Sequence, residues 1–127
     1  MQDTNFTWPQ GEDMVVELRY REGKTASQAL PVNLAGGYTA RMSIVNPSAP
    51  DTILKTLSTE PDGGITLLSG TSGPNIVVRL DRSLTLSGPL VPPVSYVYDF
   101  FLRNSAGEQV KILEGAITVR RSVTQWL

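Results

Sequence analysis

Apolar and polar residues alternate with a period of two over several short stretches of the chain. Residues 14–20 and residues 38–44 show this alternation most clearly, and each stretch is bounded by glycine or proline. A period of two places successive side chains on opposite faces of a strand. Both stretches therefore predict β-strands with one buried face. Pro47 and Pro50 are expected to end the second strand, because proline donates no ladder hydrogen bond.

The later part of the chain predicts two further strand pairs. Residues 96–103 and 109–119 flank the loop 104–107, whose glycine and length are typical of a β-hairpin. Residues 65–68 and 75–80 flank a second glycine-containing loop, and the latter stretch is rich in β-branched residues. Four strands in two pairs are expected here.

Two short stretches are harder to assign from the pattern alone. Residues 52–57 fit either a short strand or a helical turn. Residues 81–86 predict a short helix capped by Asp81 or Ser83, which the following glycine and prolines cannot continue. No amphipathic helix separates the strands. We therefore expect an all-β fold, an antiparallel, immunoglobulin-like β-sandwich of about seven to eight short strands with long loops.

Length and composition agree with this fold class. The chain has 127 residues, a usual length for one domain, and its 11 glycines and 9 prolines imply many turns. We expect one domain over residues 1–127, with residues 120–127 as an exit tail. The N-terminus lacks the features of a secretory signal. The protein is therefore expected to be made in the cytoplasm.

Charge argues against two classes of partner. The net charge is −1, with −3 on residues 1–62 and +2 on residues 63–127. Proteins that bind nucleic acid or anionic membranes usually carry a basic field, so neither partner is expected. The mild imbalance between the two halves is typical of an ordinary surface, although it would also allow head-to-tail contact between copies.

The residues needed for common catalytic and metal sites are missing. The chain contains neither histidine nor cysteine, which excludes the Ser-His-Asp and Cys-His arrangements and any thiolate metal site. We expect no enzymatic activity, no cofactor and no bound metal.

The aromatic residues near the two ends suggest different roles. Trp8 is expected in the core, whereas Trp126 is expected at an interface, because it is followed by Leu127 after a predicted strand. Arg120 and Arg121 precede this apolar pair. We therefore predict that Arg120, Arg121, Trp126 and Leu127 bind a partner; a tail docked on its own domain is the alternative.

Five segments in order along the chain resemble a family of small tail-associated virion proteins of tailed bacteriophages. This family includes the amino-terminal attachment domains of baseplate and tail-fibre proteins. The segments are Gln-Gly-Glu-Asp at 10–13, Leu-Ala-Gly-Gly-Tyr-Thr-Ala-Arg-Met at 34–42, Gly-Ile-Thr-Leu at 64–67, Tyr-Asp-Phe at 98–100 and Leu-Glu-Gly-Ala-Ile-Thr-Val at 113–119.

The resemblance implies a structural adaptor or decorating subunit of a virion, at the tail, baseplate, fibre attachment or neck. Its expected partners are other virion proteins and further copies of itself in a symmetric homo-oligomer, and its expected location is the virion. The family offers no catalytic residues to carry over. The alternative function is a carbohydrate-binding module for host-surface adhesion, in which Trp8, Tyr38 or Tyr96 would stack on sugar rings.

Overall fold

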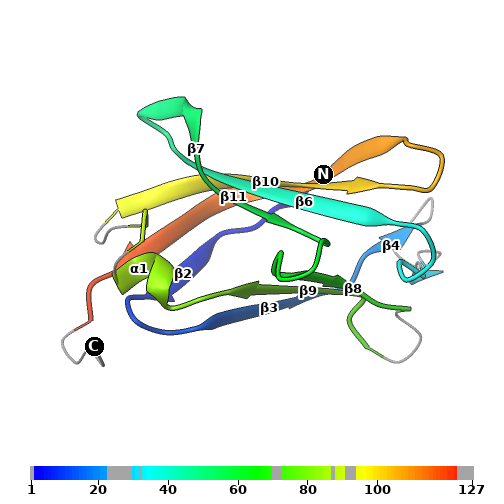
Figure 1. Ribbon diagram of the computed structural model, residues 1–127, viewed down its shortest axis with the longest axis horizontal. Coiled ribbons are helices and arrows are strands. Elements are labelled where there is room, and N and C mark those ends of the chain that lie inside the picture. The colour runs from blue at the N-terminus through cyan, green and yellow to red at the C-terminus, as the bar shows by residue number, and fades with distance from the viewer. Residues whose placement is uncertain are drawn as a thin grey trace.

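The computed structural model describes residues 2–22, 30–31, 33–69, 73–86, 88–90 and 94–122, and these form a β-sandwich (Figure 1). The elements are β1 (Gln2–Asp3), β2 (Phe6–Pro9), β3 (Met14–Leu18), β4 (Arg21–Glu22), β5 (Leu30–Pro31), β6 (Thr39–Asn46), β7 (Ala49–Ser58), β8 (Ile65–Leu67), β9 (Ile76–Leu80), α1 (Ser83–Leu86), β10 (Val94–Arg103) and β11 (Gln109–Arg120).

The two layers differ in size. The larger sheet has the order β1-β11-β10-β6-β7, with β2 also paired to β11, and the smaller sheet has the order β3-β9-β8. A two-stranded ribbon joins β4 and β5. Eight of the described strands have three or more residues. The all-β sandwich that the pattern predicts is therefore confirmed.

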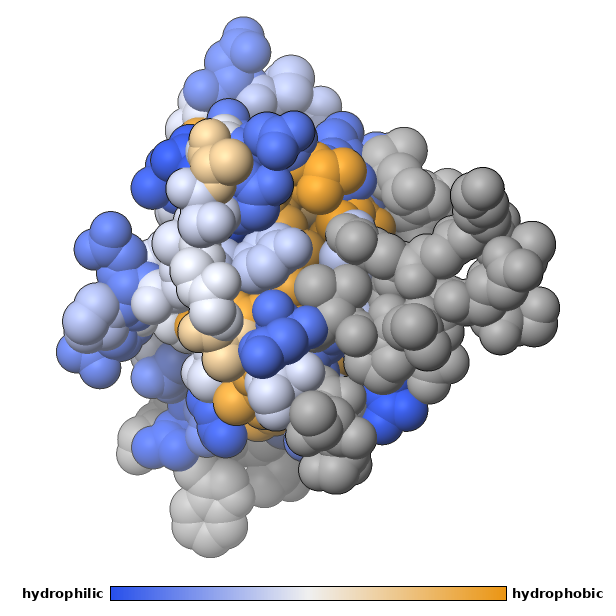
Figure 2. Space-filling view, turned by 90° about the vertical axis from the view of Figure 1, so that its right-hand side faces the viewer, coloured by the Kyte–Doolittle hydropathy of each residue, from blue (hydrophilic) through white to orange (hydrophobic). Residues whose placement is uncertain are grey.

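The core lies between the sheets and follows the predicted alternation. On β6, Ala40, Met42 and Ile44 are buried while Arg41 is exposed. The inward side chains of β10 are buried in the same way, at Tyr96, Tyr98, Phe100 and Leu102. In the end view of Figure 2, hydrophobic side chains show in the middle of the described surface and hydrophilic ones surround them.

The structure settles the assignments that the pattern left open. Residues 52–57 belong to the ten-residue strand β7, and the short helix forms as α1. The cap of α1 is Asp81, whose Oδ1 accepts a hydrogen bond from the Ser83 amide at 3.0 Å. Pro50 does not end β6 but lies within β7, which stands at the sheet edge, where its missing donor costs no ladder bond.

The sandwich departs from purely antiparallel pairing at its N-terminal strands. Both β1 and β2 pair with β11 in parallel, with Phe6 opposite Ile117 and Trp8 opposite Val119. This register buries Trp8 and Val119 completely, as expected for Trp8. No hairpin connects β1 or β2 to β11, so their pairing with β11 need not be antiparallel. In the parallel direction the indole ring is buried.

Asn75 is a buried polar side chain that extends the pairing of β3 and β9. It is fully buried, its Oδ1 accepts a hydrogen bond from the Tyr20 amide at 2.7 Å, and its Nδ2 donates to the Tyr20 carbonyl at 2.8 Å. The amide side chain thus takes the place of a backbone partner. Such pairing offsets the cost of burying the Asn75 side-chain amide and the Tyr20 backbone groups.

Gly115 is required where the N-terminal segment crosses β11. Between β1 and β2 the Thr4 amide donates to the Glu114 carbonyl at 2.9 Å, and Asn5 Oδ1 accepts from the Ala116 amide at 2.9 Å. A Cβ atom placed on Gly115 would overlap the Thr4 carbonyl group. The close approach of the two backbones therefore depends on the missing side chain.

We expect Gly115→Ala to lower the free energy of unfolding by about 1 to 3 kcal/mol, the usual cost of overpacking. The loss is measured by denaturant unfolding. Gly36→Ala is the matched control, because a Cβ atom at Gly36 meets no atom within 4 Å. Equal stability of the two variants would show that the Thr4 segment does not approach β11 this closely.

Candidate functional site: the exit end of the sandwich

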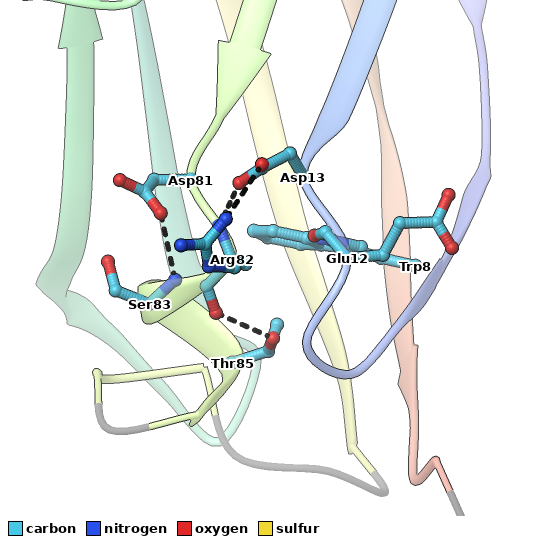
Figure 3. A network of polar contacts seen from close by, with 7 residues as sticks. All are labelled: Trp8, Glu12, Asp13, Asp81, Arg82, Ser83 and Thr85. Carbon is cyan, nitrogen blue, oxygen red and sulfur yellow. Dashed lines mark hydrogen bonds and ion pairs between the residues drawn. The ribbon is translucent and has the colours of Figure 1, made fainter. Parts of the chain in front are cut away.

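Three segments meet where the chain leaves β11, and together we call them the exit end. They are the turn of residues 9–13 between β2 and β3, the loop and helix of residues 81–86, and residues 120–122. The three lie far apart in the sequence and come from both sheets. Polar side chains hold them together, and Figure 3 shows the contact between the turn and the residue before the helix.

The turn of residues 9–13 is held from inside by Trp8. Its indole Nε1 donates to the Glu12 carbonyl at 2.6 Å, while the ring is fully buried. The Glu12 amide donates to the Pro9 carbonyl at 3.3 Å, and Gly11 has a φ of 83°. Glycine accepts this left-handed backbone at little cost. The turn therefore places Asp13 at the start of β3.

Asp13 connects the turn to the residues before α1. Its Oδ1 accepts from the Arg82 amide at 2.8 Å, and its Oδ2 lies 3.5 Å from Arg82 Nη1. Both side chains are more than half exposed, so the ion pair itself contributes little stability. The contact joins the turn to the residue before α1, as Figure 3 shows.

Thr85 is the central polar side chain of the exit end. It is buried, its Oγ1 accepts from the Gly11 amide at 2.9 Å, and the same hydroxyl donates to the Arg82 carbonyl at 3.1 Å. The Thr85 carbonyl in turn accepts from Gln10 Nε2 at 3.2 Å. One residue of a four-residue helix thus satisfies polar groups on the neighbouring turn.

Gln10 joins this network to the end of β11. Its backbone amide donates to the Arg120 carbonyl at 2.8 Å, and its backbone carbonyl accepts from Ser122 Oγ at 2.7 Å. The Ser122 amide also lies 3.4 Å from Gln10 Oε1. The backbone on both sides of Arg121 is therefore anchored to the domain.

The structure places two of the four predicted partner-binding residues at the exit end. Arg120 is the last residue of β11, Arg121 follows it, and both are exposed. Trp126 and Leu127 lie outside the described residues. Because Arg120 belongs to the strand and Ser122 is bonded to Gln10, the attached part of the chain reaches beyond the expected start of the tail at residue 120.

Sequence reasoning missed the residues that hold this end together, namely Gln10, Thr85 and Ser122. The predicted cap of α1 was the available signal for the helix. Nothing in the sequence pairs that helix with residues 10 and 122, because their contacts span 74 residues or more.

Two of the three aromatic residues that the sugar-binding alternative would use are buried. Trp8 and Tyr96 are buried, with exposed fractions of 0% and 3%, so neither ring can stack on a sugar. Tyr38 is only partly exposed and packs against the core.

Within the described ranges, no group of three acidic residues is arranged to hold a metal ion. The same part of the chain contains no helix long and apolar enough to cross a membrane.

Comparisons with known proteins add a similarity in fold. No protein-family model matches the sequence. No curated protein sequence is significantly similar to it. Among solved structures, the chain is similar to CopC from Methylosinus trichosporium OB3b, with a TM-score of 0.45 and 17% identity over 96% of this chain and 89% of that one. A likeness at this level carries no inference about function.

We expect Thr85→Val to lower the free energy of unfolding by about 1 to 3 kcal/mol, because the Gly11 amide loses its acceptor while the side-chain volume stays the same. Amide hydrogen exchange should show faster exchange at Gly11. Thr85→Ser keeps the hydroxyl and serves as the control, in which the Gly11 amide should stay protected. Unchanged Gly11 exchange in Thr85→Val would contradict the assigned hydrogen bond.

Proposed function

We propose that this protein is a structural adaptor or decorating subunit of a tailed-phage virion that works through protein–protein contacts. In this role the sandwich is a rigid platform, and the exit end presents the partner-binding residues Arg120, Arg121, Trp126 and Leu127. The partners are other virion proteins and further copies of this chain, and the location is the virion.

The observation that carries the proposal is the geometry of the exit end. Arg120 and Arg121 are exposed, yet their backbone is held by hydrogen bonds from Gln10 and Ser122 to a buried network. Exposed side chains on an ordered backbone bind with a smaller loss of conformational entropy than side chains on a mobile loop. Arginine is also among the residues enriched at interface hot spots.

Two further observations support the proposal. The five segments that resemble tail-associated virion proteins fall largely on β6, β8, β10, β11 and the turn of residues 9–13, which are the framework of the sandwich. The absence of histidine and cysteine from the sequence leaves few catalytic arrangements open. Binding is the class of function that these properties favour.

We expect a chain ending at Ser122 to fold but to be absent from virions, because it keeps β11 and the Gln10 contacts while it lacks Trp126 and Leu127. Folding is checked by circular dichroism and thermal unfolding. Incorporation is checked by immunoblotting of purified particles from phage that carry the shortened gene. Normal incorporation of the shortened chain would exclude Trp126 and Leu127 from this role.

The two arginines are tested independently of the tail by a double variant that combines Arg120→Ala with Arg121→Ala. We expect at least a tenfold drop in incorporation at unchanged thermal stability, since both side chains are exposed. Arg103→Ala is the matched control, because Arg103 is also exposed but lies at the far end of β10. Electron microscopy with an antibody against the native protein then locates it on the particle. Unlabelled particles would overturn the adaptor function.

A further inference from the structure

The outer face of the large sheet carries a partly exposed row of apolar side chains. The buried side chains of β6, β10 and β11 face the small sheet, so the residues that alternate with them point to the other side. On that side Val97 lies opposite Ala116 and Val45, and Val45 in turn lies opposite Ile53 of β7. Val97 is 38% exposed and Ile53 is 58% exposed. The solvated face of such a sheet usually carries polar side chains, so we call these four residues the apolar row and consider them a contact surface.

The apolar row lies in a groove that crosses the sheet. The groove has a volume of about 630 Å³, and its lining extends from Pro50 and Ile53 on β7 to Asn5 before β2. Two register irregularities interrupt the pairing of β6 with β7 beside it, at residues 44–46. Such irregularities bend a strand, and in Figure 1 the start of β7 rises from the large sheet on the side away from the small sheet. The bent start of β7 therefore forms one wall of the groove.

The lining of the groove is acidic beside the apolar row. Of the residues that line it, the charged ones are Asp99 and Glu114, which lie directly opposite each other on β10 and β11. We call these two residues the acidic pair. Neither carboxylate is in an ion pair in the described part of the chain. Like charges in this position destabilise a strand pair, so a cation placed between the two carboxylates would relieve their repulsion.

Two basic side chains share this face of the sheet but do not line the groove. Lys111 and Arg41 lie opposite Phe101, one row beyond the acidic pair along the strands. The Lys111 ammonium group lies 5.9 Å from the centre of the Phe101 ring. The apolar row lies on the other side of the acidic pair. A cation that enters from the groove therefore approaches the carboxylates from the side away from Lys111 and Arg41.

We infer that this groove binds a polypeptide segment of another protein, in which a lysine or an arginine lies next to apolar side chains. The apolar side chains pack on the apolar row, and the cation lies between Asp99 and Glu114. The two rows are two residues apart along each strand, which is about 7 Å, so neighbouring side chains of one segment reach both. The inference goes beyond the proposed function, because it adds a binding surface separate from the exit end and does not require a virion.

The first experiment is a selection from random seven-residue peptides displayed on yeast, with the purified full chain as the target. Peptides that bind the Ile53→Ser variant equally well are discarded. Because Ile53 is exposed, this substitution should leave the fold intact. We expect the remaining peptides to be enriched in lysine or arginine next to apolar residues. A selection without such peptides, or without enrichment of a basic residue, would overturn the inference.

The second experiment tests the acidic pair by fluorescence anisotropy of a labelled peptide from this selection. We expect Asp99→Asn combined with Glu114→Gln to weaken binding at least tenfold. Thermal stability should stay the same or rise, because the double variant removes a repulsion. The matched control combines Glu12→Gln with Glu17→Gln, since both residues are exposed and neither lines the groove. Equal binding by the Asp99/Glu114 variant and the unchanged protein would contradict the inference.

Methyl NMR then locates the bound peptide on the surface. We expect shifts of the Ile53 and Val97 methyl signals, whereas those of Val110 should stay unchanged. Val110 is a suitable reference because it is 50% exposed and lies outside the groove. Shifts that leave Ile53 and Val97 unaffected would place the peptide elsewhere and overturn the inference.

A second copy of this chain is the other possible occupant, and sedimentation velocity of the full chain tests it. We expect any self-association to persist in the Ile53→Ser variant. Self-association that this substitution abolishes would assign the groove to a second copy and overturn the inference. Because purified protein is used throughout, these failures are distinct from the absence of the protein from virions.

Discussion

The parallel pairing of the N-terminal segment with β11 is the constraint on which the rest of the structure depends. It buries Trp8 opposite Val119, and it delivers Gln10 to the end of β11, where the turn into the second sheet begins. The pairing requires a backbone approach at Gly115 that no side chain would allow. One strand direction therefore determines the core, the crossing between sheets and the position of the exit end.

Buried polar groups give this arrangement its specificity. Asn75 and Thr85 are buried, and each is hydrogen-bonded to backbone groups of segments distant in sequence. A buried polar side chain is tolerated only where its partners are in place, so such residues discriminate against alternative packings. Hydrophobic burial alone would stabilise the sandwich without fixing how the turn, the helix and the exit strand meet.

The two sheets differ in size. The smaller sheet has three strands facing a six-stranded sheet, and among the described elements its edge strand β3 pairs with β9 alone. An open edge of this kind risks aggregation unless it has a specific partner.

The sequence by itself determined the strands β3, β6, β8 and β9, the hairpin of β10 and β11, the buried faces of β6 and β10, and the capped helix α1. These follow from alternation, turn residues and caps, which act over a few residues. The parallel direction of β1 and β2, the strand β7, the open edge at β3 and the anchoring of the exit end were decided only by tertiary structure. The contact of Ser122 with Gln10 spans 112 residues, and no local pattern encodes a pairing over that distance, because it depends on how the whole core packs.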